Sequence, residues 1–109
     1  MNNLLSKKCV PCEGGIPPFT QEQIKQYVPL VPGWEVGENK KLQRDFKFKD
    51  FKETMQWVNK VADLAESEGH HPDILIHGWN KVRLELTTHA INGLSENDFI
   101  LAAKINALR

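Results

Sequence analysis

The sequence DFKETMQWVNKVADLAESEGHHP, residues 50–72, decides the fold class of this chain. Its apolar residues recur every three or four positions, which is the spacing of one face of an α-helix. Asp50 and Glu53 form a capping pair that begins a helix, and Gly69 suits the left-handed conformation that ends one. We therefore predict a helix over about 50–67 with an apolar stripe made of Phe51, Met55, Val58, Ala62 and Ala65.

On both sides of this helix, apolar residues alternate with polar ones, a period typical of half-buried strands. The alternating runs cover 42–48 and 81–88. Each follows a turn and a short apolar segment, at 34–36 and 74–77, so each pair predicts a β-hairpin.

Two further capping pairs predict helices at about 20–28 and 95–107. The second of these is apolar on more than one face, so we expect part of it to face another subunit. The predicted order is helix, two strands, helix, two strands, helix. This order indicates an α+β fold, with a four-stranded antiparallel sheet and three helices on one of its faces.

The length of 109 residues suits one domain, which we place at 19–109. Residues 1–18 are expected to form a flexible arm that contains one CxxC pair, Cys9 and Cys12. Two thiols are half of a usual structural zinc set, so we expect them to be reduced and without a role. Zinc shared with a histidine or with a second chain is the alternative.

Fourteen basic residues balance fourteen acidic ones, so the chain has no overall field that attracts nucleic acid. The longest apolar run has five residues, 99–103, far below the ~20 that span a membrane. No secretory signal is evident at the start. We expect a cytoplasmic protein with neither a nucleic-acid nor a membrane partner.

All four histidines lie between positions 70 and 89. His70 and His71 precede Pro72, which favours extended backbone for His71. His89 follows the last predicted strand, and hairpin pairing brings it close to His70 and His71. If that strand stays regular, His89 lies at the edge of the open sheet face; His77 lies at the opposite end of the hairpin. Glu66 is positioned to orient one imidazole.

Three converging imidazoles indicate acid–base chemistry, since histidine ordinarily changes charge between about pH 5 and 8. Two other interpretations stay open. The histidines could simply be satisfied polar residues that cap a helix. They could also form a three-histidine zinc site, although adjacent side chains in an extended segment point in different directions and chelate one metal poorly.

The chain resembles the pterin-4a-carbinolamine dehydratases over about residues 20–107, and their bacterial branch most of all. The shared motifs include Glu66 followed by His70-His71-Pro72, and then Thr88-His89, Gly93-Leu94 and Asp98. Gly69 departs from the animal branch, where an acidic residue is common, so any help from that carboxylate is absent here. Asp98 is expected to act as the third residue of a capping box.

The resemblance implies that the chain removes water from a 4a-hydroxytetrahydropterin and releases quinonoid dihydropterin. It implies no metal or organic cofactor, a homodimer or homotetramer, and a functional link to an aromatic amino acid hydroxylase. His70, His71 and His89 would be the catalytic residues, with His71 and His89 as the acid–base pair. The implied substrate-binding residues are Glu66, Pro72, Thr88, Ala90 and Ile91. Relatives of this fold also serve as dimerisation cofactors or assembly chaperones, which leaves a non-catalytic binding module as the alternative.

Overall fold

The computed structural model describes residues 4–10 and 16–108. Within these ranges the elements follow the predicted order, and the α+β fold is confirmed. The helices are α1 (Gln21–Tyr27), α2 (Phe51–Glu68) and α3 (Glu96–Asn106). The strands are β1 (Glu35–Gly37), β2 (Lys41–Lys47), β3 (Asp73–His77) and β4 (Lys81–Leu86). Short 3₁₀ turns are η1 (Leu4–Ser6), η2 (Val28–Leu30) and η3 (His89–Ile91).

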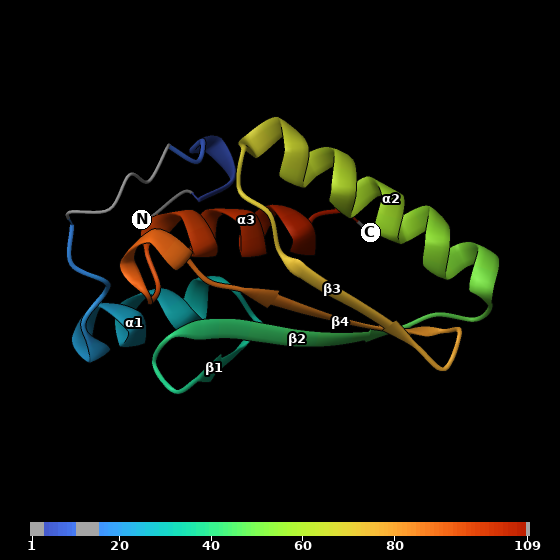
Figure 1. The fold of residues 1–109 in the computed structure, drawn as a ribbon, viewed down its shortest axis with the longest axis horizontal. Helices are drawn as coiled ribbons and strands as arrows, with labels where there is room; N and C mark the ends of the chain where they lie inside the picture. Colours follow the sequence, from blue (N-terminus) through green and yellow to red (C-terminus); the bar gives the residue numbers. More distant parts are fainter. Residues whose placement is uncertain (1–3, 11–15, 109) are drawn as a thin grey trace.

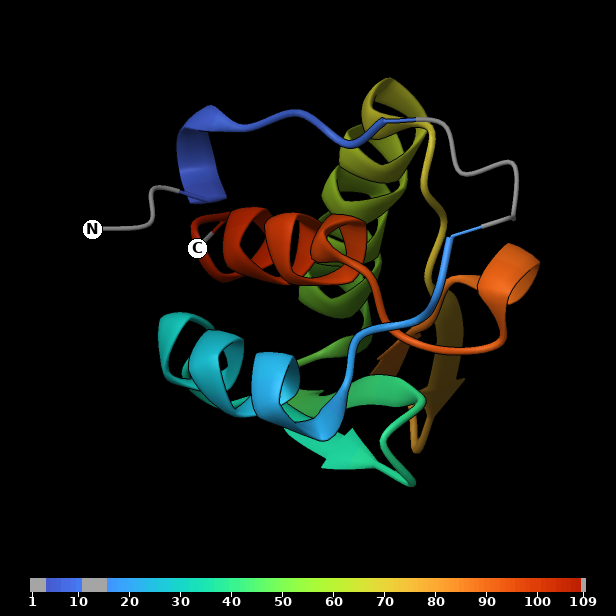
Figure 2. The same cartoon turned by 90° about the vertical axis from the view of Figure 1, so that its left-hand side faces the viewer.

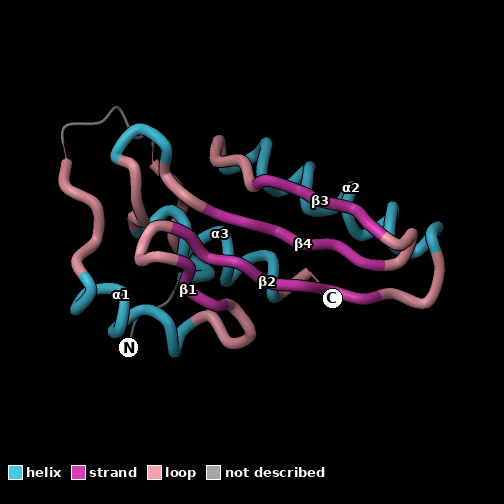
Figure 3. The backbone as a smooth tube through the Cα atoms, turned by 60° about the horizontal axis from the view of Figure 1, so that its bottom comes forward, coloured by secondary structure: helices cyan, strands magenta, loops and turns pink. Residues whose placement is uncertain are grey.

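The four strands form one antiparallel sheet in the order β1-β2-β4-β3 (Figure 3). The two predicted hairpins, β1–β2 and β3–β4, join through the central pairing of β2 with β4, in which Phe46 lies opposite Val82. Alternate residues of the central strands are buried, including Phe46, Val82 and Leu84. The helices lie on this apolar side, with α2 and α3 above the sheet and α1 beside its β1 end (Figures 1 and 2).

Helix α3 is buried on nearly every side within a single chain. The sheet, α2, η2 and the N-terminal turn η1 surround it, and its residues from Phe99 to Ala103 and Ile105 are all buried. A helix that is apolar all round belongs in a core. The prediction that its breadth reflects contact with another subunit was therefore wrong, because the chain's own segments cover it.

The buried face of α2 is rotated from the predicted stripe. It consists of Thr54, Trp57, Val58, Val61 and Ala65. Phe51 and Ala62 are exposed instead. The cause is Trp57, whose ring lies 4.4 Å from that of Phe46 and 5.1 Å from that of Phe48 between centroids. Packing of this large aromatic side chain on the sheet outweighs burial of the smaller residues, so Trp57 is a core residue.

Residues 4–10, which we call the docked arm, pack against the ends of α2 and α3. Leu4 is buried in the core. The N–H of Cys9 donates to Glu68 Oε1 (2.9 Å), and its thiol donates to the carbonyl of Asn97 (3.5 Å). Cys12, the second member of the CxxC pair, lies outside the described residues. No helix in the described part of the chain is long and apolar enough to cross a membrane.

Replacing Phe99 with alanine tests whether α3 is the centre of the core. Phe99 is 0% exposed, so its loss leaves a cavity and should lower the free energy of unfolding by about 3–5 kcal/mol. The matched control is Phe51→Ala, also in a helix but 54% exposed, which should cost less than about 1 kcal/mol. Urea unfolding followed by circular dichroism measures both; equal losses would contradict this core.

The burial of Cys9 predicts an unreactive thiol. Burial, with a further contribution from Glu68, raises its pKa to about 12. A raised pKa means that the neutral thiol's contribution to stability is complete below the ordinary pKa and is lost as pH rises through about 12. In a Cys12→Ser variant at pH 8, reaction of Cys9 with a disulfide reagent should be roughly a hundred- to a thousandfold slower in native than in unfolded protein. Similar rates in both states would contradict the docking of the arm.

Candidate active site

The β3–β4 hairpin brings the predicted histidines together. Asp73 pairs with Glu85, so the segment before β3 lies beside the segment after β4. His70 and His71 are on the first segment, and His89 is on the second. Strand β4 ends at Leu86, earlier than predicted.

His89 therefore does not continue the strand alternation. Thr88 bridges to Gly93, and His89 begins the short turn η3. The prediction that placed His89 at the edge of the open face through regular strand parity was wrong in this detail. Thr88 and Gly93 form two backbone hydrogen bonds with each other, so residues 89–92 are the loop between them and not a continuation of β4.

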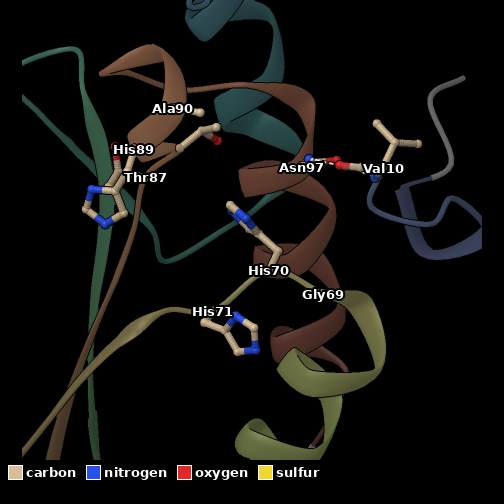
Figure 4. Close-up of a pocket in the computed structure, with 9 residues that line it drawn as sticks. Val10, Gly69, His70, His71, Thr87, His89, Ala90 and Asn97 are labelled. Carbon is tan, nitrogen blue, oxygen red and sulfur yellow. Dashed lines mark hydrogen bonds between the residues drawn. The ribbon is translucent and has the colours of Figure 1, made fainter. Parts of the chain in front are cut away.

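A cavity of about 250 Å³ lies where these segments meet. This is below the roughly 300–1,000 Å³ typical of pockets for drug-sized ligands, so it suits a small ring system. Its walls come from the end of α2, the segment after β4, the start of α3 and the docked arm (Figure 4). The lining residues are Val10, Gly69, His70, His71, Thr87, Thr88, His89, Ala90 and Asn97.

His70 is held by a buried carboxylate. Its Nε2 lies 2.7 Å from Asp98 Oδ1, and the exposed fractions of the two side chains are 13% and 0%. With Asp98 Oδ1 as the acceptor, Nε2 of His70 donates this hydrogen bond and Nδ1 is left for other interactions. The contact fixes both the tautomer and the ring orientation of His70.

Asp98 is also the point where α3 and the loop after β4 meet. Its Oδ2 accepts from the Ser95 N–H (3.0 Å) and from Thr88 Oγ1 (2.8 Å). The predicted capping box of α3 is thus present, and the same carboxylate serves a second purpose with its other oxygen. With donors on both oxygens, this buried group is satisfied.

His71 has a different environment from its neighbour. Its Nε2 lies 2.9 Å from Glu66 Oε1, with both side chains largely exposed, at 64% and 81%. Solvent screens such a pair, so Glu66 orients the ring weakly. His70 and His71 thus have different partners, as expected for neighbours in extended backbone. Across the described residues, no side-chain hydrogen bond holds the exposed ring of His89.

The other predicted binding residues take different places. Thr88 and Ala90 line the cavity, whereas Glu66 reaches it only through His71. Pro72 and Ile91 are half-buried neighbours that are not among the lining residues.

The sequence did not predict the contact of Asp98 with His70, nor four of the residues that line the cavity: Val10, Gly69, Thr87 and Asn97. For Asp98 the sequence held an indication: an acidic residue in the first turn of an apolar helix can be buried with that helix, and a buried carboxylate needs hydrogen-bond donors. For Val10 and Asn97 the sequence held no such indication, because a contact between residues 87 positions apart leaves no periodic pattern.

Among the residues that the structure describes, no three His, Cys, Asp or Glu side chains are gathered in a way that could hold a metal ion.

Comparison with known proteins assigns this arrangement to a family. Residues 17–108 match the family model described as pterin 4 alpha carbinolamine dehydratase. A protein of Alkaliphilus metalliredigens, named as a candidate pterin-4-alpha-carbinolamine dehydratase, is 50% identical over 97% of this chain and 96% of its own length.

Two solved structures share the fold. A transcriptional coactivator/pterin dehydratase from Brucella melitensis is 33% identical, with a TM-score of 0.77 over 84% of this chain and 97% of that one. A pterin dehydratase-like protein identified as a RuBisCO assembly factor of the alpha-carboxysome is 26% identical, with a TM-score of 0.60 over 72% of this chain and 92% of that one. On the near-complete match to the family model and to these relatives, the chain belongs to the pterin 4 alpha carbinolamine dehydratase family.

Proposed function

We propose that this chain converts a 4a-hydroxytetrahydropterin into quinonoid dihydropterin and water by histidine acid–base catalysis. The observation that carries the proposal is that His70, His71 and His89 all line the same cavity, with His70 fixed by Asp98. Family membership supplies the substrate class. The cavity supplies the groups that the reaction needs.

The reaction requires one acid and one base. The N5 lone pair of the pterin forms a double bond to C4a as the C4a–O bond breaks, and an acid protonates the departing oxygen to give water. A base then takes the N5 proton, which leaves the neutral quinonoid product. Each transfer by a positioned side chain contributes typically 10²–10⁴-fold, and histidine suits both roles near neutral pH.

His71 and His89 are our acid–base pair, because both rings are accessible and neither is held by a buried partner. The ring of His70 is held more firmly, by Asp98, and its Nδ1 would form a hydrogen bond that positions the pterin. Thr88, Ala90 and the backbone up to Ile91 would bind the edge of the ring, with Pro72 beside it. Glu66 would orient His71, which its 2.9 Å contact supports.

In the cell, this activity would follow an aromatic amino acid hydroxylase, which leaves the 4a-hydroxy adduct, and precede a reductase. We propose that the protein works in the cytoplasm as a homodimer or homotetramer, with no cofactor of its own. The alternative is a non-catalytic assembly or dimerisation module, a role for which the carboxysomal assembly factor of the same fold is a precedent. Retention of three histidines around one cavity favours catalysis, because a scaffold does not need them.

Stopped-flow absorbance of 4a-hydroxytetrahydropterin decay tests the proposal. Wild-type protein should accelerate the decay, also after chelator treatment, and His71→Ala and His89→Ala should each lose about 10²–10⁴-fold in kcat. The matched control is His77→Ala, since His77 is exposed at the opposite end of the hairpin; it should keep the wild-type rate.

If folded wild-type protein leaves the decay rate unchanged, this result would contradict the dehydratase proposal and favour the binding module. Loss of activity with the chelator, and recovery with zinc, would favour the metal-site interpretation instead. Equal effects of all three histidine substitutions would point to a general loss of folding.

A further inference from the structure

The docked arm lies outside the segment matched by the family model, which begins at residue 17. Val10, its last residue, nevertheless lines the same cavity as the three histidines. The geometry points to a role in substrate binding: the docked arm supplies one wall of the pterin cavity, with Val10 as a contact residue and Asn97 as the positioning residue that holds it. This inference rests on the proposed function and extends it to a segment outside the matched domain.

Asn97 clamps Val10 through both ends of its carboxamide. The Val10 N–H donates to Asn97 Oδ1 (3.0 Å), and Asn97 Nδ2 donates to the Val10 carbonyl (2.7 Å). Only a primary amide offers a donor and an acceptor in this arrangement. The Asn97 side chain is itself buried and lines the cavity, so the clamp is part of the wall (Figure 4).

A second set of contacts ties the arm to the end of α2. Glu68 accepts the Cys9 N–H with one oxygen and Lys104 Nζ (2.7 Å) with the other. Burial by itself would raise the pKa of Glu68, but the hydrogen bonds from Lys104 and Cys9, together with the positive charges of Lys104 and Lys8, outweigh it and lower this pKa. Lys8 Nζ also donates to the Ser67 carbonyl (3.0 Å). The arm therefore stays attached to a charged Glu68 at neutral pH.

These anchors lie next to the residues that hold the catalytic pocket in shape. Glu68 is two positions before His70, and Asn97 is one position before Asp98. The docked arm thus bridges the same two helix ends that supply the His70–Asp98 pair, as it crosses above α3 toward the end of α2 (Figure 2). Val10 lies at the rim of this cavity, 67% exposed, on the side away from His89 (Figure 4).

This placement predicts an effect on binding and little on chemistry. A pterin is a flat bicyclic ring with apolar faces and polar edges. An apolar wall contacts the ring equally in the ground state and in the transition state, so losing it raises KM and leaves kcat nearly unchanged.

The test compares Asn97→Leu and Val10→Gly with wild type in the dehydration assay. Leucine has nearly the shape of asparagine but no hydrogen bonds, and Val10→Gly removes the apolar wall while leaving the clamp. Each should raise KM roughly three- to tenfold and change kcat less than about twofold. The matched control is Asn59→Leu, the same substitution at an exposed site on α2, which should leave both constants unchanged.

A second readout does not depend on catalysis. The Kd of 7,8-dihydrobiopterin, an unreactive pterin, should rise by the same factor in both arm variants when measured by calorimetry. If wild type binds this pterin without dehydrating the substrate, the proposed chemistry fails and the Kd ratio alone decides the role of the arm. If wild type neither binds nor reacts, both proposals fail.

Wild-type KM and Kd in correctly folded Asn97→Leu and Val10→Gly would overturn the inference and leave the dehydratase proposal standing. A fall in kcat at unchanged KM would overturn it as well, because the arm would then act on the chemistry or on the fold. Circular dichroism and thermal melting identify any variant that has lost its structure.

Discussion

A buried carboxylate, Asp98, is the group on which the site depends. It accepts hydrogen bonds from three separate parts of the chain: from His70 after α2, from Thr88 after β4, and from Ser95 at the start of α3. Leaving a buried polar group without a partner costs about 1–3 kcal/mol, and more when it is charged. The need to satisfy this one group therefore fixes three segments relative to each other, and all three carry cavity residues.

The direction in which the chain leaves each element brings these segments together. Gly69 ends α2 with φ +67°, a conformation that other residues adopt only with strain, and the chain leaves the helix there as extended backbone. His70 and His71 consequently point to different partners, one buried and one exposed. The β3–β4 hairpin then returns the chain to the same end of the sheet, where η3 presents His89. A firmly held imidazole thus lies beside two accessible ones, which is a suitable arrangement for binding a flat substrate and moving its protons.

Much of this could be predicted because local patterns carry it. Strand alternation, capping pairs and hairpin spacing predict the order of elements, and hairpin pairing alone brings His89 toward His70 and His71. The errors arose where packing decides. The position of Trp57 on the aromatic side chains of the sheet rotates α2 away from its apparent stripe. Covering of α3 by the chain's own N-terminal turn cannot be read from the breadth of its apolar surface.

The site shows the same division. The role of Asp98 as a capping residue follows from its spacing to Ser95, but its contact with His70 joins positions 28 apart. The clamp between Asn97 and Val10 joins residues that are farther apart still in the sequence. Asn97 bonds only the backbone of Val10, so these bonds require no particular side chain at position 10, and no sequence pattern reveals them. Interactions of this kind depend on the completed tertiary structure.

The most direct test of this account is a double-mutant cycle on the dehydration rate, with Asp98→Asn, His70→Ala and the combined variant. If Asp98 acts by holding His70, each single substitution should lower kcat/KM by roughly tenfold or more, and the double variant should be no slower than His70→Ala. A loss from Asp98→Asn that recurs in full without His70, in protein shown to be folded, would contradict the claim that the buried carboxylate works through this histidine.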